Sequence, residues 1–221
     1  MKTCWLNRQG HALCIVFMAG WGMGPEPFAH IPPGQHDLLL VYDYREIECR
    51  SLEKSLSDNT YHRILLLAWS MGVWVAGTLW DPGSLPFDDA TAIGGTCSPV
   101  DDKSGIPPDI FDSMINDFTE TSLQDFYTAM FTSPPETERF MANRPDSPLS
   151  ELKRELVNLR NTCTQRATAA DIFKRHIVTG RDRIFPARNQ IRAWGKNNYE
   201  VFSWSHFPFY DKKCWLKLLN L

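Results

Sequence analysis

The sequence lacks the features that mark several other classes of protein. Its apolar runs fall well short of the roughly 20 residues that a membrane-spanning helix needs. Its formal net charge is -3, so it has no excess of positive charge of the kind that binds nucleic acid or anionic membranes. It contains no internal repeat and no low-complexity segment. What remains is an ordinary globular composition, and 221 residues are enough for one domain with a buried core.

Closely spaced cysteines are also absent. The six cysteines include no C-x-x-C pair and no spacing typical of metal ligands. In a chain of this length they are interpreted as free thiols in a reducing compartment, which predicts a cytoplasmic protein. The glycines at 20, 22 and 24 do not fit the G-x-G-x-x-G spacing of dinucleotide-binding loops. We therefore expect neither a metal ion nor a cofactor.

The N-terminal segment has two interpretations. Lys2 and Arg8 precede an apolar run at residues 12–20, which loosely resembles a short signal peptide. However, no clean A-x-A cleavage site follows that run. The preferred interpretation is a hairpin turn at residues 7–10, followed by a buried strand.

Alternating strand and helix signals predict the fold class. Apolar segments without strict alternation of polar residues are typical of parallel strands that are covered on both faces. We expect strands at residues 3–6, 13–18, 37–42, 63–69, 91–94, 176–179 and 199–203, and helices at 51–57 and 211–219. This order predicts an α/β fold with a mostly parallel, doubly wound central sheet flanked by helices.

Residues 105–168 carry no strand signal. Apolar residues recur there at helical spacing, and prolines at 134, 135, 145 and 148 separate the segments. The pattern predicts about three short helices inserted as a cap, with residues 1–104 and 169–221 forming the core. The alternative is that these helices simply face the core of a larger domain. The return of strand signals after residue 169 favours the cap.

Charge is uneven over the same region. Residues 101–138 contain nine acidic residues and one lysine, whereas residues 147–175 contain six basic and three acidic residues. A solvated helix surface is the simpler explanation. The alternative is a docking site for an acidic partner, for which Lys153, Arg154 and Arg160 are the candidate contacts.

The most informative motif is Ala68-Trp69-Ser70-Met71-Gly72. It follows an apolar strand and precedes a segment that can continue as a helix. Small residues two positions before and after the serine let strand and helix backbones approach closely at a sharp turn. Such a turn exposes the serine hydroxyl at the sheet edge, so Ser70 is the candidate nucleophile of a serine hydrolase.

A serine nucleophile needs a base, and the base needs an orienting acid. In this fold class the three residues follow in the order Ser, Asp, His. Asp182 follows the strand expected at 176–179, and His206 follows the strand expected at 199–203. His206 is also the only histidine downstream of Asp182. The alternative for Asp182 is an ion pair with Arg181 or Arg183 in a surface loop.

An oxyanion hole requires two backbone N–H groups directed at the reacting oxygen. Met71, directly after the candidate nucleophile, is expected to supply one of them. The glycine-rich segment 19–24 follows an early strand and can turn tightly, so the N–H of Trp21 is the second candidate.

Taken together, these motifs resemble the α/β-hydrolase family, and most closely its BioG-type pimeloyl-[acyl-carrier protein] methyl ester esterases. The resemblance rests on residues 17–22, 42–45, 68–72, 180–186 and 205–209, which span nearly the whole chain but include no cap motif. Two positions depart from the wider pattern. Ala68 replaces the first glycine of G-x-S-x-G, and Ala19 stands where many members have a histidine that braces the oxyanion loop.

The resemblance implies a serine esterase of biotin biosynthesis that converts pimeloyl-ACP methyl ester to pimeloyl-ACP and methanol, with an acyl carrier protein as partner. It implies Ser70, Asp182 and His206 as the triad and the Trp21 and Met71 amides as the oxyanion hole. Four apolar cap residues are expected to contact the acyl chain: Phe126, Tyr127, Met130 and Phe131. The alternatives are a general short-chain carboxylesterase or thioesterase of the same fold and, more remotely, a non-catalytic hydrolase-fold binding protein.

Overall fold

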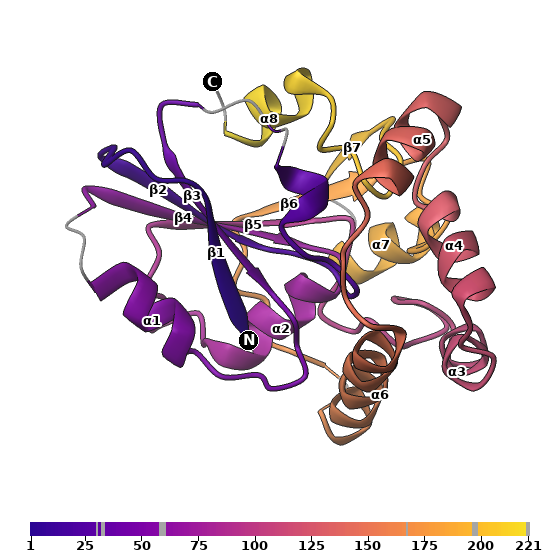
Figure 1. Cartoon of the computed structure of the whole chain (residues 1–221). Helices are drawn as coiled ribbons and strands as arrows, with labels where there is room; N and C mark the ends of the chain where they lie inside the picture. Colours follow the sequence, from indigo (N-terminus) through magenta and orange to yellow (C-terminus); the bar gives the residue numbers. More distant parts are fainter. Residues whose placement is uncertain (30, 32–33, 58–60, 167, 196–198, 220–221) are drawn as a thin grey trace.

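The computed structural model describes residues 1–29, 31, 34–57, 61–166, 168–195 and 199–219 (Figure 1). Its centre is a seven-stranded sheet in the spatial order β1-β3-β2-β4-β5-β6-β7. In chain order the strands are β1 (Lys2–Asn7), β2 (Leu13–Met18), β3 (Asp37–Tyr42), β4 (Arg63–Trp69), β5 (Asp89–Ile93), β6 (Arg175–Thr179) and β7 (Glu200–Phe202). Every neighbouring pair is parallel except β1 with β3. The predicted mostly parallel sheet is therefore confirmed.

The middle of the sheet forms the core of the protein. Every side chain from Cys14 to Met18 in β2 is fully buried, as expected for a strand that is covered on both faces. The register pairs Met18 of β2 with Ala68 of β4, and Ala68 with Ala92 of β5. The carboxyl ends of these strands therefore meet at one edge of the sheet, where open α/β sheets place their binding sites.

The predicted hairpin at residues 7–10 is wrong. β1 and β2 do not pair with each other, because β3 lies between them. The carboxylate of Asp37, at the start of β3, accepts hydrogen bonds from the backbone N–H groups of Gln9, Gly10 and His11. These bonds hold the β1–β2 connection against β3, so the turn crosses the end of a third strand instead of closing a two-stranded hairpin.

Helices cover the sheet on both sides. The helices α1 (Arg50–Ser57) and α2 (Met71–Leu79) lie on one side of the sheet, and α8 (Lys212–Leu218) lies on the other (Figure 1). The helix α7 (Ala187–Trp194) packs beside β6, and the short 3-10 helix η1 (Glu26–Phe28) follows the glycine-rich segment after β2. Both sides of the sheet are thus shielded from water, which explains the continuous apolar runs of its middle strands.

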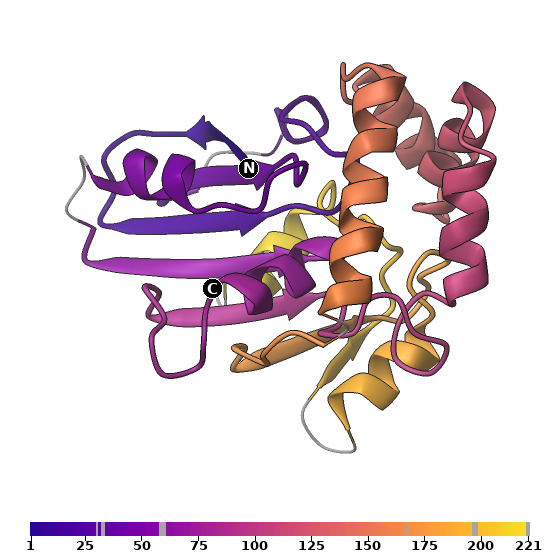
Figure 2. The same ribbon diagram turned by 90° about the horizontal axis from the view of Figure 1, so that it is seen from below.

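Four more helices gather at the carboxyl ends of the strands (Figures 1 and 2). They are α3 (Pro108–Asn116), α4 (Glu120–Ala129), α5 (Pro134–Ala142) and α6 (Leu149–Gln165). Proline opens α3 and α5, where a missing backbone N–H has no cost, and Thr119 and Ser122 form a capping box on α4. The sequence predicts about three short helices here, but α6 alone has 17 residues. The prolines at 145 and 148 lie in one loop before α6 and do not divide a helix.

Two smaller expectations concern cysteines and membranes. All six cysteines are unpaired thiols, as predicted. Within the described ranges, none of the helices combines the length and the apolar character that crossing a bilayer requires.

Candidate active site

Ser70 lies on a sharp turn between β4 and α2. Its backbone dihedrals are φ 57° and ψ -125°, a combination that L-residues rarely adopt. The turn also brings backbones unusually close together. A Cβ atom added at Gly72 would lie 2.5 Å from the carbonyl oxygen of Met18, so no larger residue fits at that position. Ala68 is fully buried in β4, and its methyl group is tolerated there.

His206 contacts both of the other residues predicted for the triad. Its Nε2 atom lies 3.0 Å from the Ser70 hydroxyl oxygen, and its Nδ1 atom lies 2.7 Å from Oδ2 of Asp182. All three residues come from different strand ends, after β4, β6 and β7. The indole N–H of Trp69 donates to the backbone oxygen of His206 at 2.8 Å and fixes the loop that carries the imidazole. The imidazole is 99% buried, so its contacts are shielded from bulk water.

Asp182 is held by a network that the sequence did not reveal. Its Oδ1 atom accepts the backbone N–H groups of Ile184 and Phe185, each at 2.8 Å. Its Oδ2 atom accepts the hydroxyl of Thr179 at 2.6 Å and the side-chain amide of Gln190 at 3.2 Å. The expected alternative, an ion pair with a neighbouring arginine, does not occur among the described residues, where the one salt-bridge partner of Asp182 is the histidine.

The glycine-rich segment after β2 lies against Ser70. A Cβ atom at Gly20 would meet the Ser70 Cβ at 3.1 Å and its hydroxyl oxygen at 3.3 Å. Gly20 therefore lies against the Ser70 side chain, and Trp21 is the next residue along the chain. Met71 follows Ser70 as the first residue of α2. Both predicted N–H donors belong to backbone that borders the same small space.

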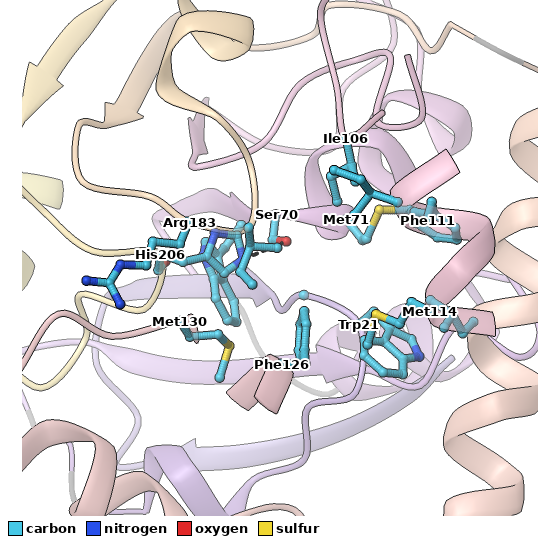
Figure 3. A pocket seen from close by; sticks show the side chains of 15 residues that line it. Trp21, Ser70, Met71, Ile106, Phe111, Met114, Phe126, Met130, Arg183 and His206 are labelled. Carbon is cyan, nitrogen blue, oxygen red and sulfur yellow. Dashed lines mark hydrogen bonds between the residues drawn. The ribbon is translucent and has the colours of Figure 1, made fainter. Parts of the chain in front are cut away.

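A cavity of about 110 Å³ opens over Ser70 and His206. The Ser70 hydroxyl points into it, and Trp21, Phe111 and Met114 lie across from His206 (Figure 3). Except for Ser70, His206 and Arg183, its lining side chains are apolar or aromatic. They come mainly from the strand ends and from α3, α4 and α6: Trp21, Trp69, Met71, Ile106, Ile110, Phe111, Met114, Phe126, Met130, Leu156 and Ile184. Such a lining suits an apolar acyl group next to a polar reaction centre.

Only two of the four predicted acyl-contact residues line this cavity. Phe126 and Met130, four positions apart at the end of α4, both face it. Tyr127 follows Phe126 on α4 and points elsewhere, because each helical residue is rotated by about 100° from the last, and Phe131 lies beyond the end of that helix. The hydroxyl of Tyr127 donates to the backbone oxygen of Gly22 at 3.0 Å, and Phe131 packs in an aromatic cluster under α5.

The contribution of α3 to the cavity is not predicted from the sequence. Ile110, Phe111 and Met114 belong to the apolar residues at helical spacing within residues 105–168, and that spacing alone does not indicate contact with an acyl chain. Ile110 is 62% exposed and lies on the cavity lining, whereas Phe111 is buried. An exposed large apolar side chain beside a buried one is typical of a cavity mouth, but the exposure is known only once the fold is known.

The three predicted docking residues lie on α6. The guanidinium of Arg160 donates to both oxygens of Asp112 on α3, at 2.6 and 2.9 Å, so its charge is paired within the helices. Arg154 is exposed and lines a small polar hollow beside Asp43. Lys153 is partly exposed. An acidic partner would therefore meet Lys153 and Arg154 as charges more readily than Arg160.

Comparison with known proteins identifies the family. The sequence model of the family described as pimeloyl-ACP methyl esterase BioG matches residues 1–215 of this chain. The chain belongs to the BioG family. The crystal structure of BioG from Haemophilus influenzae covers 95% of both chains with 33% identity and a TM-score of 0.82. An uncharacterised protein of the same species is 36% identical over 197 residues, which are 88% of this chain and 87% of that one.

A longer relative is also similar. Malonyl-[acyl-carrier protein] O-methyltransferase of Bacteroides fragilis is 37% identical over 201 residues, which are 90% of this BioG-family chain but only 40% of the relative. The chain thus spans less than half the length of that protein.

More distant structures confirm the fold. A lipase-esterase related protein of Clostridium acetobutylicum is 12% identical, with a TM-score of 0.65 and 99% of this chain covered. This likeness shows the α/β-hydrolase fold, as predicted. Together with the family match, it makes the chain an esterase-family member of that fold.

Proposed function

We propose that this protein hydrolyses the methyl ester of a pimeloyl group attached to acyl carrier protein, releasing methanol and pimeloyl-ACP in biotin biosynthesis. The observation that carries the proposal is the contact of the His206 imidazole with both Ser70 and Asp182 at the floor of an apolar cavity. The family match supports the identity of the substrate. The 3.0 Å contact between Nε2 and the serine hydroxyl supports the type of reaction.

In the first half of the reaction, the Ser70 oxygen attacks the ester carbonyl and His206 Nε2 accepts its proton. Asp182 accepts the Nδ1–H of His206 at 2.7 Å, which fixes the tautomer and stabilises the imidazolium. The N–H groups of Trp21 and Met71 donate to the oxyanion of the tetrahedral intermediate. The intermediate collapses, the methoxy group leaves as methanol with the proton from His206, and the acyl group remains on Ser70.

In the second half, water attacks the acyl-enzyme. His206 accepts a proton from this water as its oxygen bonds to the carbonyl carbon, and the same two N–H groups stabilise the second oxyanion. The Ser70 oxygen then leaves with the proton from His206. The products are a free carboxylic acid and the regenerated enzyme, so the chain's own side chains account for every proton transfer.

The cavity is suited to the methylene chain of the substrate. The apolar side chains of Phe111, Met114, Phe126 and Met130 would contact the chain, while its carrier-linked end extends past the exposed Ile110. We assign the surface around Lys153, Arg154 and Arg160 on α6 to docking of the carrier protein, as the sequence suggests. The ion pair between Arg160 and Asp112 makes the first two residues the stronger contacts.

The test compares methanol release from pimeloyl-ACP methyl ester with hydrolysis of short p-nitrophenyl esters. We expect a much higher kcat/KM for the carrier-linked ester. Equal or better efficiency on the simple esters would instead assign the protein as a general carboxylesterase. The Ser70→Ala variant separates both from a non-catalytic binding protein, because it should abolish almost all turnover of either ester.

A further inference from the structure

Glu155 is a buried acid on α6 that the triad chemistry does not use. It is 3% exposed, although glutamate is rarely found inside proteins. One of its carboxyl oxygens accepts the backbone N–H of Tyr44 at 2.8 Å. The backbone N–H of Gly22 is near enough to lower the pKa of the carboxyl group. No basic side chain forms a salt bridge with it among the described residues. A buried acid held only by backbone N–H groups orders the backbone that donates them.

These contacts converge on the segment that carries the candidate N–H donor. Gly22 directly follows Trp21, and its φ of 70° lies in the left-handed region. The indole N–H of Trp21 donates to the backbone oxygen of Leu152 on α6, one turn before Glu155. The hydroxyl of Tyr44, whose N–H binds Glu155, donates to the backbone oxygen of Ala19 at 2.6 Å. Hydrogen bonds thus hold the segment directly before the Gly20–Trp21 peptide, at Ala19, and directly after it, where Gly22 accepts from the Tyr127 hydroxyl.

We propose that Glu155 is a positioning residue for the oxyanion hole. Its carboxyl group ties the Tyr44 amide to α6, and the Tyr44 hydroxyl holds Ala19, so Glu155 helps to set the direction of the Trp21 N–H. The inference rests on the proposed function, because it assumes that this N–H stabilises the oxyanion at Ser70. It explains how the segment stays ordered with alanine at position 19, since the bracing side chain comes from α6 instead.

The test compares Glu155→Met with Glu155→Gln, using hydrolysis of p-nitrophenyl acetate. Methionine has a similar length but accepts no strong hydrogen bond, whereas glutamine keeps one carbonyl acceptor. We expect Glu155→Met to lower kcat by about tenfold or more with little change in KM, since a misdirected N–H weakens transition-state binding alone. Glu155→Gln should recover most of that loss. Asp112→Asn is the control, because it breaks a tie between α3 and α6 that does not touch the segment.

Circular dichroism and thermal melting establish that each variant is folded. Wild-type kcat in folded Glu155→Met overturns the proposal, and so does an equal loss in the glutamine and methionine variants. If Glu155→Met does not fold, the proposal is tested by the ratio of the kcat of Glu155→Gln to the kcat of wild type, measured at several pH values. We expect that ratio to rise as Glu155 ionises in the wild type, because a carboxylate beside the segment opposes the developing oxyanion. A ratio that is constant with pH overturns the proposal.

The pH arm of this test depends on the surroundings of Glu155. Burial raises the pKa of Glu155 to about 8, although the backbone N–H groups of Tyr44 and Gly22 lower it. The charged and titratable groups that face it are Asp43, Arg45, Tyr44 and Tyr127.

The use of a simple ester also separates this proposal from the proposed function. If the wild-type protein hydrolyses p-nitrophenyl acetate but not the carrier-linked ester, the proposed substrate is contradicted. The comparison of the Glu155 variants on the simple ester remains a valid test.

Discussion

The buried acid on α6 makes the stability of this protein depend on pH in a specific way. Burial raises the pKa of Glu155 from 4.5 to about 8 in the folded state. In the unfolded chain the same group is exposed and ionises near its ordinary value. Between these two values the folded protein keeps a proton that the unfolded chain releases. Unfolding is therefore favoured as the pH rises, and we predict that Glu155→Gln removes this dependence.

The magnitude follows from the size of the shift. A carboxyl pKa raised on folding contributes stability that is complete below about pH 4.5 and is lost as the pH rises through about 8. At about 1.4 kcal/mol for each pKa unit, the full loss is about 5 kcal/mol. Glutamine at position 155 has no proton to release. The stability of Glu155→Gln relative to wild type should therefore increase by several kcal/mol across this range.

The neighbouring groups do not produce the same effect. Burial raises the pKa of Tyr44 and Tyr127, so both stay neutral in this range. Burial also raises the pKa of Asp43, but hydrogen bonds from Arg45 and Lys2 outweigh it and hold that pKa below the ordinary value. Asp43 is therefore ionised throughout.

The assay is urea denaturation of both proteins at several pH values between about 5 and 8, followed by tryptophan fluorescence. All other titratable groups are common to both proteins, so their contributions cancel in the difference. A stability difference that stays constant across the range would refute the argument, because it would mean that Glu155 ionises equally in the folded and unfolded states. A difference that falls with pH would refute it as well.

Four further predictions concern the site and its surroundings. Asp182→Asn should lower kcat by about 10³–10⁴ with little change in KM, because it disturbs the tautomer of the histidine; steady-state kinetics on p-nitrophenyl acetate measure this. Gly72→Ala should lower both the melting temperature and kcat, because its methyl group would lie 2.5 Å from the last carbonyl oxygen of β2. Phe111→Leu should shift the preference among p-nitrophenyl esters toward longer acyl chains, because it enlarges the cavity. Charge reversal at Lys153 and Arg154 should lower kcat/KM on the carrier-linked ester and leave the simple esters unchanged, and an unchanged value on the carrier-linked ester would contradict docking at that surface.

The sheet could be predicted because its strands are short, apolar runs bounded by turn residues. The observed β2, β3 and β4 have the bounds expected from the sequence, and the other strands differ by one or two residues at one or both ends. The pairing of β1 was not predictable in the same way. Residues 7–10 have the composition of a tight turn, and composition does not reveal that Asp37 of β3 binds the backbone of that turn. Local signals identify elements, but long-range hydrogen bonds decide which elements are neighbours.

The residues of the candidate triad could be selected from the sequence because chain order constrains them. Ser70, Asp182 and His206 follow three strands whose carboxyl ends share one edge, so parallel pairing is enough to bring them together. The groups that hold Asp182 were not visible, since Thr179 and Gln190 are ordinary residues whose role arises only from β6 packing against α7. The cavity lining was half predictable for a related reason. Hydrophobic spacing marks a helix face as buried but does not distinguish a face that meets the core from one that meets a cavity.

The geometry at Ser70 also explains why small residues surround it. Its backbone conformation is strained by roughly 1–3 kcal/mol and persists only where neighbouring structure leaves no alternative. Here the Ser70 N–H donates to the carbonyl oxygen of Ile93 in β5 at 2.9 Å, and its carbonyl oxygen accepts from Val73 in α2 at 3.1 Å. Gly95 closes the other side, since a Cβ atom there would lie 2.3 Å from the Ser70 carbonyl oxygen. Backbone contacts at glycine positions therefore hold Ser70 in place. A methyl group at Gly95 would displace the Ser70 backbone, although Gly95 itself contributes no side chain to the site.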